Sequence, residues 1–283
     1  MSAAPKSLQR TDLRNRATQW GLIGLAVAYV AVLLMAPIIG IAWKAFENGF
    51  GVIADTFKQP DVTHAFTLTA VITVVTVAVT ALFGLVVAWV LARDRFPGKS
   101  LMNASVDVPF AVSPIIVGLM VVLLFGRGGW FEGFFAARGI QVLFALPSMI
   151  LVTVFIAIPF VIREVAPVLK AVGTEEEDAA RTLGASSTQV FRRITLPHIR
   201  WALAYGVALS TARALGEVGA VLVVSGAIQG HTETATLYVM RALDQNQTSP
   251  AYTVALSLAF VSIAILGTIE FMKNRRLHLE GKN

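Results

Sequence analysis

The stretch that decides the fold reads DAARTLG at residues 178–184, continues through nine residues, and ends with ITLP at residues 194–197. It is polar and charged, and long apolar segments precede and follow it. Charged connectors between apolar segments are typical of the loops of a membrane protein that crosses the bilayer several times. We therefore place this stretch in a loop outside the membrane.

The composition around this loop is that of a membrane protein. Of 283 residues, 56% are hydrophobic and only 14% are charged, which is too apolar for a soluble domain of this length. A helix needs roughly 20 residues to cross a bilayer, and lipid does not satisfy unpaired backbone groups. We predict an all-α polytopic membrane protein with a transmembrane domain over residues 19–272. Its six predicted transmembrane helices cover residues 19–43, 65–92, 104–125, 141–162, 200–226 and 251–271.

The positive charges predict which side of the membrane each loop faces. Segments 1–18 and 273–283, the loop after the second predicted helix and the loop at 163–199 hold or border 17 Lys and Arg residues, whereas the other loops carry 5. The positive-inside rule therefore places both termini and the loop at 163–199 in the cytoplasm. The net charge of +6 gathers beside the predicted helices, so it indicates membrane lipid and no nucleic acid as a partner.

The sequence gives no sign of metal, thiol or hydrolytic chemistry. It has no cysteine, which excludes disulfides, thiolate metal sites and catalytic thiols, and its 4 histidines are scattered over predicted loops and the tail. We expect no metal site and no catalytic residue. A membrane-embedded enzyme is disfavoured because no Ser/His/Asp or metal-ligand constellation is present.

The loop at 163–199 predicts two short helices. Thr174 followed by Glu177 has the form of a capping box, and a helix can run from there to Gly184, the residue type favoured just past a helix end. A second capping box begins at Ser186, and its helix is expected to end before Pro197. A helix of about nine residues is marginal in water, so the first one needs a packing partner.

The partner of the first short helix stays open on these grounds. Its small, weakly apolar face carries Ala179, Ala180 and Leu183 and suits a groove on another protein. The same features suit an ordinary amphipathic connector that packs on its own helix bundle.

The spacing of this loop resembles E-A-A-x₃-G-x₉-I-x-L-P, the EAA signature of permeases of ABC importers. The match falls on Ala179, Ala180, Gly184, Ile194, Leu196 and Pro197, and Asp178 replaces Glu, which keeps the charge and shortens the side chain. Segments 109–114, 159–164, 191–203 and 212–220 resemble the sulfate/thiosulfate permeases of the CysW type. Molybdate, tungstate and phosphate permeases share the loop, so a molybdate or tungstate importer is the alternative.

The resemblance implies the type I permease fold of ABC importers, in the bacterial inner membrane. It implies a CysT-like second permease subunit in a heterodimer, a CysA-like ATPase dimer that binds ATP and Mg, and a periplasmic or lipid-tethered binding protein. This chain would hold no cofactor itself. The residues expected to couple it to the ATPase are Thr174, Glu177, Asp178, Ala179, Ala180, Leu183, Gly184, Ile194, Leu196 and Pro197.

Two charged residues fall inside the fifth predicted helix. Arg213 lies 13 residues beyond Arg200, which is about 20 Å along a helix, and Glu217 follows one turn later. On a continuous helix both share a stripe with Ser210, and such a stripe faces protein or water because charges in lipid are costly. Either Arg213 attracts a passing anion, or the pair is a structural ion pair.

The third predicted helix contains a dense group of helix-breaking residues, namely Pro109, Ser113 and Pro114. Proline within a membrane helix frees a backbone carbonyl and bends the helix. Two interpretations remain open: a broken helix beside the translocation pathway, or a plain packing kink.

Overall fold

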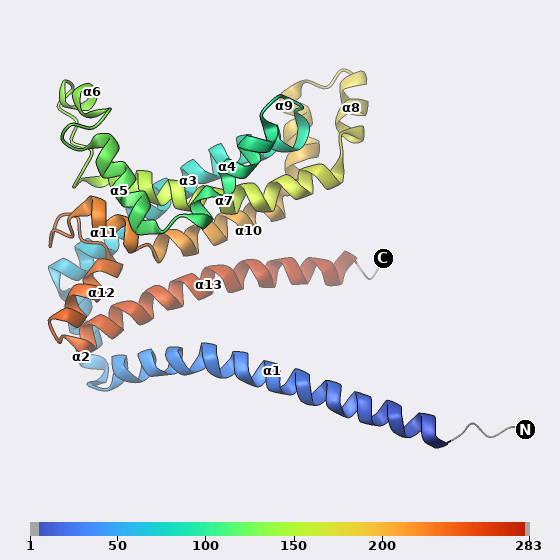
Figure 1. Cartoon of the computed structure of the whole chain (residues 1–283), viewed down its shortest axis with the longest axis horizontal. Helices are drawn as coiled ribbons and strands as arrows, with labels where there is room; N and C mark the ends of the chain where they lie inside the picture. Colours follow the sequence, from blue (N-terminus) through green and yellow to red (C-terminus); the bar gives the residue numbers. More distant parts are fainter. Residues whose placement is uncertain (1–5, 281–283) are drawn as a thin grey trace, which may run out of the picture.

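The computed structural model describes the backbone of residues 6–280 and the side chains of residues 19–271 (Figure 1). Within that part it contains helices joined by turns and no strand, which confirms the all-α prediction. The elements are α1 (Lys6–Phe46), α2 (Gly49–Lys58), α3 (Pro60–Arg93), α4 (Lys99–Ala111), α5 (Pro114–Phe125), α6 (Glu132–Ala136), α7 (Leu146–Val172), α8 (Glu175–Thr182), α9 (Ser187–Val190), the π-helical turn η1 (Phe191–Thr195), α10 (Leu196–Leu215), α11 (Gly219–Ser225), α12 (Ala235–Asp244) and α13 (Thr248–Glu280).

Four segments of the described chain are unbroken helices long and apolar enough to cross a membrane, namely Gln19–Phe46, Pro60–Arg93, Leu146–Val172 and Thr248–Phe271. The third and fifth predicted helices are each broken in two. The α4–α5 pair bends by 111°, and the pair formed by Ser187–Leu215 and α11 bends by 55°. Counting each bent pair as one span gives six, in agreement with the predicted number.

Local chemistry explains where these two helices break. Ser113 precedes Pro114 and has an extended conformation, because the proline ring disfavours the helical region for the residue before it. Pro114 then starts α5, where its missing N–H is not needed. The other break follows Leu215 at Gly216, a residue type that commonly ends helices.

The centre of the bundle is α7, which packs most extensively against α3 and α10. Figure 1 shows α8 and both ends of the chain on the right, and α2, α6 and α12 on the left. We call these the α8 end and the α12 end. The loop at 163–199 and both ends of the described chain therefore lie on one side.

Two glycines let the three central helices approach closely around Val161 of α7, which is fully buried. A Cβ built on Gly84 of α3 would lie 2.9 Å from Val161 Cβ, and one built on Gly206 of α10 would lie 2.9 Å from Val161 Cα. Small residues at such crossings allow the close backbone packing that holds membrane helices together. The three helices therefore form one rigid unit at this level.

The first helix lies outside this unit. The membrane-length part of α1, Gln19–Phe46, has none of its most apolar window buried, and its substantial contacts are with α13 and α2. Figure 1 shows α13 between α1 and the rest of the bundle. A long apolar helix with so little burial needs lipid or another protein along most of its surface.

Candidate functional site

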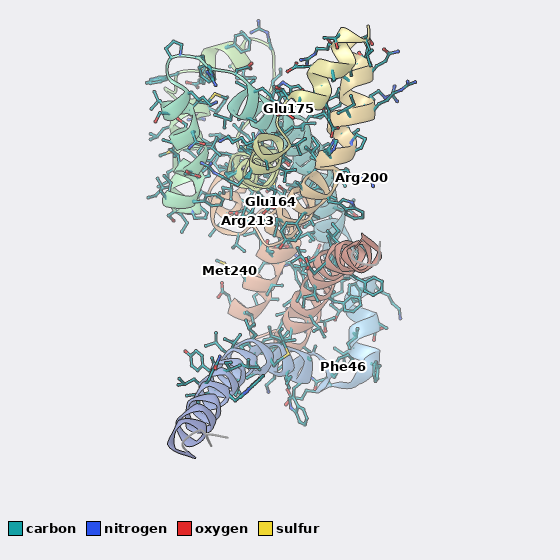
Figure 2. The ribbon with its side chains drawn as sticks, turned by 90° about the vertical axis from the view of Figure 1, so that its right-hand side faces the viewer. Phe46, Glu164, Glu175, Arg200, Arg213 and Met240 are labelled. Atoms are coloured by element: carbon teal, nitrogen blue, oxygen red, sulfur yellow. The ribbon has the colours of Figure 1, made fainter. Side chains whose placement is uncertain are left out.

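The polar loop folds at the α8 end as two short helices joined by a tight turn. The helix α8 ends before Gly184, which has a φ of +86°, and the Ala185 N–H donates to the Ala180 carbonyl. A left-handed residue at this point favours glycine because it has no Cβ. The predicted stop at Gly184 is confirmed. Figure 2 looks onto this end of the molecule, where Glu175 and Arg200 are labelled.

The capping box predicted at Thr174 is wrong. The Thr174 side chain makes no capping hydrogen bond, and only its backbone carbonyl accepts from the Asp178 N–H, at 2.8 Å. The Glu177 side chain, which the box needs at the third position, turns into the protein instead. The first turn of α8 thus keeps acids at its positive dipole end without a side-chain cap.

The second capping box is confirmed. The Ser186 hydroxyl accepts from the Gln189 N–H, and the Gln189 amide oxygen accepts from the Ser186 N–H at 2.8 Å. The prediction that the helix after this box ends before Pro197 is wrong. The helix continues through η1 into α10, and the Leu196 N–H bonds the Phe191 carbonyl five residues earlier. Pro197 has no N–H to donate, and it directly follows this π-helical turn, where the regular bonding to the carbonyl four residues earlier is already interrupted.

Glu177 ties α8 to the bundle. Its Oε1 atom accepts from the Arg93 guanidinium at 2.8 Å and from the Thr195 hydroxyl at 2.9 Å. Side-chain exposure is 3% for Glu177 and 9% for Arg93, so water hardly screens this ion pair. We call these three residues the Glu177 clasp; it joins the last residue of α3, the first turn of α8 and the last residue of η1.

The outward face of α8 has no partner within the described chain that covers it. Leu183 is 88% exposed, and Ala179 and Asp178 are also exposed, whereas Ala180 is half-buried. Asp178 accepts a hydrogen bond from Arg181 at 3.0 Å. In the following segment Ile194 and Leu196 are half-buried and Pro197 is exposed. An exposed leucine on a short helix favours docking on another protein over a connector buried on its own bundle.

The two helix breaks meet inside the bundle. A Cβ built on Gly219, at the start of α11, would lie 3.2 Å from Pro114 Cβ, and one on Gly118 would lie 2.9 Å from the Ala220 carbonyl oxygen. Pro114 thus contacts the other break, Ser113 is exposed beside it, and Pro109 is buried within α4. The 111° bend shows a broken helix and excludes a plain kink, whereas the position of this break beside a translocation pathway stays a prediction.

An arginine on α7 holds α4 in place before its break. The Arg163 guanidinium makes two hydrogen bonds to the Asp107 carboxylate, at 2.8 Å and 2.6 Å, and also bonds Asn103. Phe110 packs edge-on against Phe160 with ring centroids 5.3 Å apart. A two-fold hydrogen-bonded Arg–carboxylate pair fixes orientation as well as distance, so α4 and α7 keep one register.

Arg213 and Glu217 form the predicted ion pair, with 2.6 Å between Nη1 and Oε2. The helix does not continue through them, because it ends at Leu215, so the predicted continuous stripe is broken there. Ser210 points to α7 and donates to the Ala157 carbonyl. Glu217 accepts from the Ala220 N–H at 2.8 Å and so caps α11.

The two charges of this pair differ in burial. The Glu217 side chain is 2% exposed, and the Arg213 side chain is 29% exposed. Figure 2 labels Arg213 among the helices of the bundle, seen from the α8 end. Glu217 therefore has a structural contact at α11, while the Arg213 side chain remains partly exposed.

The α12 end has its own buried ion pair, which the sequence did not indicate. Glu233 accepts two hydrogen bonds from Arg241, at 2.6 Å and 2.9 Å, and the Tyr238 hydroxyl donates to Gln59. The hydrogen bond to Glu233 raises the pKa of Arg241, and burial raises the pKa of Tyr238. Arg241 therefore stays cationic and Tyr238 neutral at physiological pH. The ion pair joins α12 to the segment just before it, and the Tyr238 hydrogen bond links α12 to Gln59.

Among the residues that the structure describes, no group of three or more His, Cys, Asp or Glu side chains could hold a metal ion. The geometry consists of an exposed short helix, a clasp and two broken spans.

Comparison with known proteins places these features in context. The family model described as binding-protein-dependent transport system inner membrane component matches residues 82–272. The sulfate transport system permease protein CysW of Synechocystis sp. is 44% identical over 91% of this chain and 93% of its own length. The permease protein CysT of Salmonella typhimurium is 34% identical over 89% of this chain and 91% of its own length.

A solved structure has the same fold. The bacterial alginate ABC transporter in complex with alginate pentasaccharide-bound periplasmic protein contains a chain that superposes with a TM-score of 0.74 at 18% sequence identity. The match covers 94% of this chain and 96% of that one.

Proposed function

Because the chain belongs to the family of binding-protein-dependent transport system inner membrane components, we propose that it is the permease subunit of an ABC importer for sulfate and thiosulfate. It is an all-α polytopic membrane protein with the fold of an ABC-importer permease. The observation that supports sulfate as the substrate is the 44% identity, over nearly the whole chain, to a permease named for sulfate transport.

The ATPase of this importer would dock on α8. The exposed side chains of Ala179 and Leu183 form a small apolar tip, and a partner groove would supply the packing that a helix of 8 residues lacks. The chain itself is not an enzyme in this proposal. The partner ATPase dimer binds ATP and Mg and hydrolyses the nucleotide.

A second permease subunit would complete the pathway. The unburied surface of α1 offers it a long apolar helix, and the exposed side of the α4–α5 break, with Ser113, offers it a polar wall. Similarity to both CysW and CysT permeases supports a heterodimer of this chain with a CysT-like subunit. A periplasmic or lipid-tethered binding protein would deliver the anion at the α12 end, and the α8 end and both termini would face the cytoplasm.

The contacts suggest how movement of the ATPase reaches the pathway. Displacement of α8 would pass to α3 through the Glu177 clasp and to α10 through η1, which continues into that helix. Since α3, α7 and α10 are locked around Val161, they would move together. The change would open the cavity alternately to the two sides at the meeting point of the broken helices.

Arg213 is the residue that we expect to attract the anion. Replacing Arg213 alone by Gln leaves Glu217 buried without its cation, so that variant should lose stability and assembly. The double replacement Arg213→Gln with Glu217→Gln removes both charges and should assemble. Its sulfate uptake should fall by about tenfold or more, because a charge-assisted hydrogen bond to the anion is lost. Uptake at the normal rate in the assembled double variant would show that the pair is structural only.

The test of the proposed function is uptake of labelled sulfate into vesicles that carry this subunit with its second permease, its ATPase and its binding protein. We expect uptake that depends on ATP, that thiosulfate blocks and that molybdate barely affects. Uptake dominated by molybdate or tungstate would agree with the proposed permease role and contradict the proposed substrate. Sulfate entry without ATP would contradict the proposal that the complex is an ATP-driven importer.

A further inference from the structure

A second feature of the α8 end is an apolar groove of about 310 Å³ beside the Glu177 clasp. One wall is the last part of α3, with Leu85, Val86 and Trp89, and the other is the segment after α8, with Val190 and Phe191. The only charged residue that lines it is Arg181, with Ser187 as its neighbour on the rim. The groove thus combines a long apolar floor with a cation at one edge.

The apolar floor continues onto the membrane-facing surface of α3. Leu82, Phe83 and Val86 are all exposed on this helix, and a chain that crosses a membrane presents such side chains to lipid or to another subunit. Trp89 and Phe191 pack with ring centroids 5.9 Å apart, four residues before α3 ends at Arg93. Aromatic side chains at the end of a spanning helix are typical of the level of the lipid headgroups.

The rim of the groove is positively charged. Arg181 makes its short ion pair with Asp178, whose side chain is exposed, and its distance to Glu177 is 4.0 Å. Exposed pairs of this kind contribute little, whereas a phosphate accepts two parallel hydrogen bonds from a guanidinium. Arg192 and Arg193 follow Phe191, are exposed, and make no ion pair with the described side chains.

We propose that the groove binds one anionic phospholipid of the cytoplasmic leaflet. Its acyl chain lies along Leu85, Val86 and Trp89, and its phosphate accepts hydrogen bonds from Arg181 and Ser187. Juxtamembrane arginines attract anionic lipids on the cytoplasmic side, and an apolar trough that ends at an arginine matches the polarity of such a lipid. Bound there, the lipid connects α8 to α3 next to the clasp.

The inference rests on the proposed function only for placing the α8 end in the cytoplasmic leaflet. Its test is therefore a binding measurement that does not depend on uptake. The assembled importer is reconstituted in nanodiscs of phosphatidylcholine with added phosphatidylglycerol, and native mass spectrometry counts the phosphatidylglycerol that stays bound after release. Arg181→Gln and Val86→Trp should each lower the retained lipid by about tenfold or more, since they remove the cation and fill the floor.

Matched controls separate the groove from the general surface. Arg181→Lys keeps the charge but loses the paired hydrogen bonds, so it should retain more lipid than Arg181→Gln. Val74→Trp, at an exposed position of α3 away from the groove, and Arg127→Gln, near the opposite end of the bundle, should retain as much lipid as the unmodified complex. Equal retention in Arg181→Gln, Val86→Trp and the unmodified complex would overturn the proposal. So would a photo-reactive side chain in place of Val86 that cross-links to the second permease and not to lipid. A complex that transports sulfate without retaining the lipid would refute this inference and leave the proposed function standing.

Discussion

Replacing Glu177 by alanine should separate ATP hydrolysis from sulfate uptake. The change leaves the Arg93 guanidinium in a site that is 9% exposed with no carboxylate, and it removes the acceptor of the Thr195 hydroxyl. Removing one partner of a buried ion pair costs about 3–5 kcal/mol. The local cost should release α8 from α3 and η1, so the ATPase would still turn over while uptake stops. The measurement is the ratio of sulfate transported to ATP hydrolysed in vesicles.

The control for this variant is Glu176→Gln, which removes an exposed acid of the same helix, one residue earlier. It should keep a normal ratio. A second check uses both partners: Glu177→Ala with Arg93→Ala removes the unpaired charge as well, and it should be more stable than the single Glu177 variant. Because the chain has no cysteine, a Thr182→Cys label can report the release of α8 directly. A normal ratio of sulfate transported to ATP hydrolysed in Glu177→Ala would show that the Glu177 clasp does not transmit the movement of the ATPase to the membrane helices.

Replacing Gly206 by leucine should prevent assembly of the bundle. Even a Cβ at this position would lie 2.9 Å from Val161 Cα and 3.3 Å from the Phe160 carbonyl oxygen, and these backbone atoms cannot rotate away as a side chain could. Overpacking of this kind costs about 3 kcal/mol. The expected result is a strong loss of folded complex, measured as the monodisperse fraction and the thermal midpoint in detergent.

The comparison that isolates this contact is Gly267→Leu in α13, where a Cβ meets nothing within 4 Å. The same comparison with alanine is more specific, because replacing Gly by Ala inside a helix should stabilise the helix by about 1 kcal/mol when nothing is in contact with the new Cβ. Gly267→Ala should therefore be neutral or stabilising, whereas Gly206→Ala should destabilise despite the same gain in helix propensity. If the two leucine variants unfold at the same temperature, the close approach of α10 to α7 does not limit stability.

The predicted coupling residues illustrate what local sequence can and cannot indicate. Gly184 as a helix stop and the Ser186–Gln189 capping box were correct, because both depend on residues no more than a few positions apart. The Thr174 box failed because Glu177 had a stronger alternative in Arg93, which lies 84 residues away in the sequence. In the sequence Arg93 is one of the positive charges that predict the topology, and no local pattern indicates its partner.

The pathway residues show the same division. The Arg213–Glu217 pair could be predicted because i,i+4 side chains meet on one helix face, and the structure has this contact even though the helix ends between them. The prolines at 109 and 114 indicated a bend but not its size. The 111° angle depends on the way in which α5 crosses α11, with Gly118 and Gly219 allowing the approach.

The sequence by itself determined the all-helical class, the number of spans, the two short helices of the polar loop and the family, because bilayer thickness and short-range hydrogen bonding limit these to patterns along the chain. Only the tertiary structure decided that Glu177 faces inward, that two spans are broken where they touch, and that Val161 is enclosed by two glycines. Each of these depends on a contact between helices distant in sequence. The free energy of such a contact depends on which groups meet, and neither helix carries that information alone.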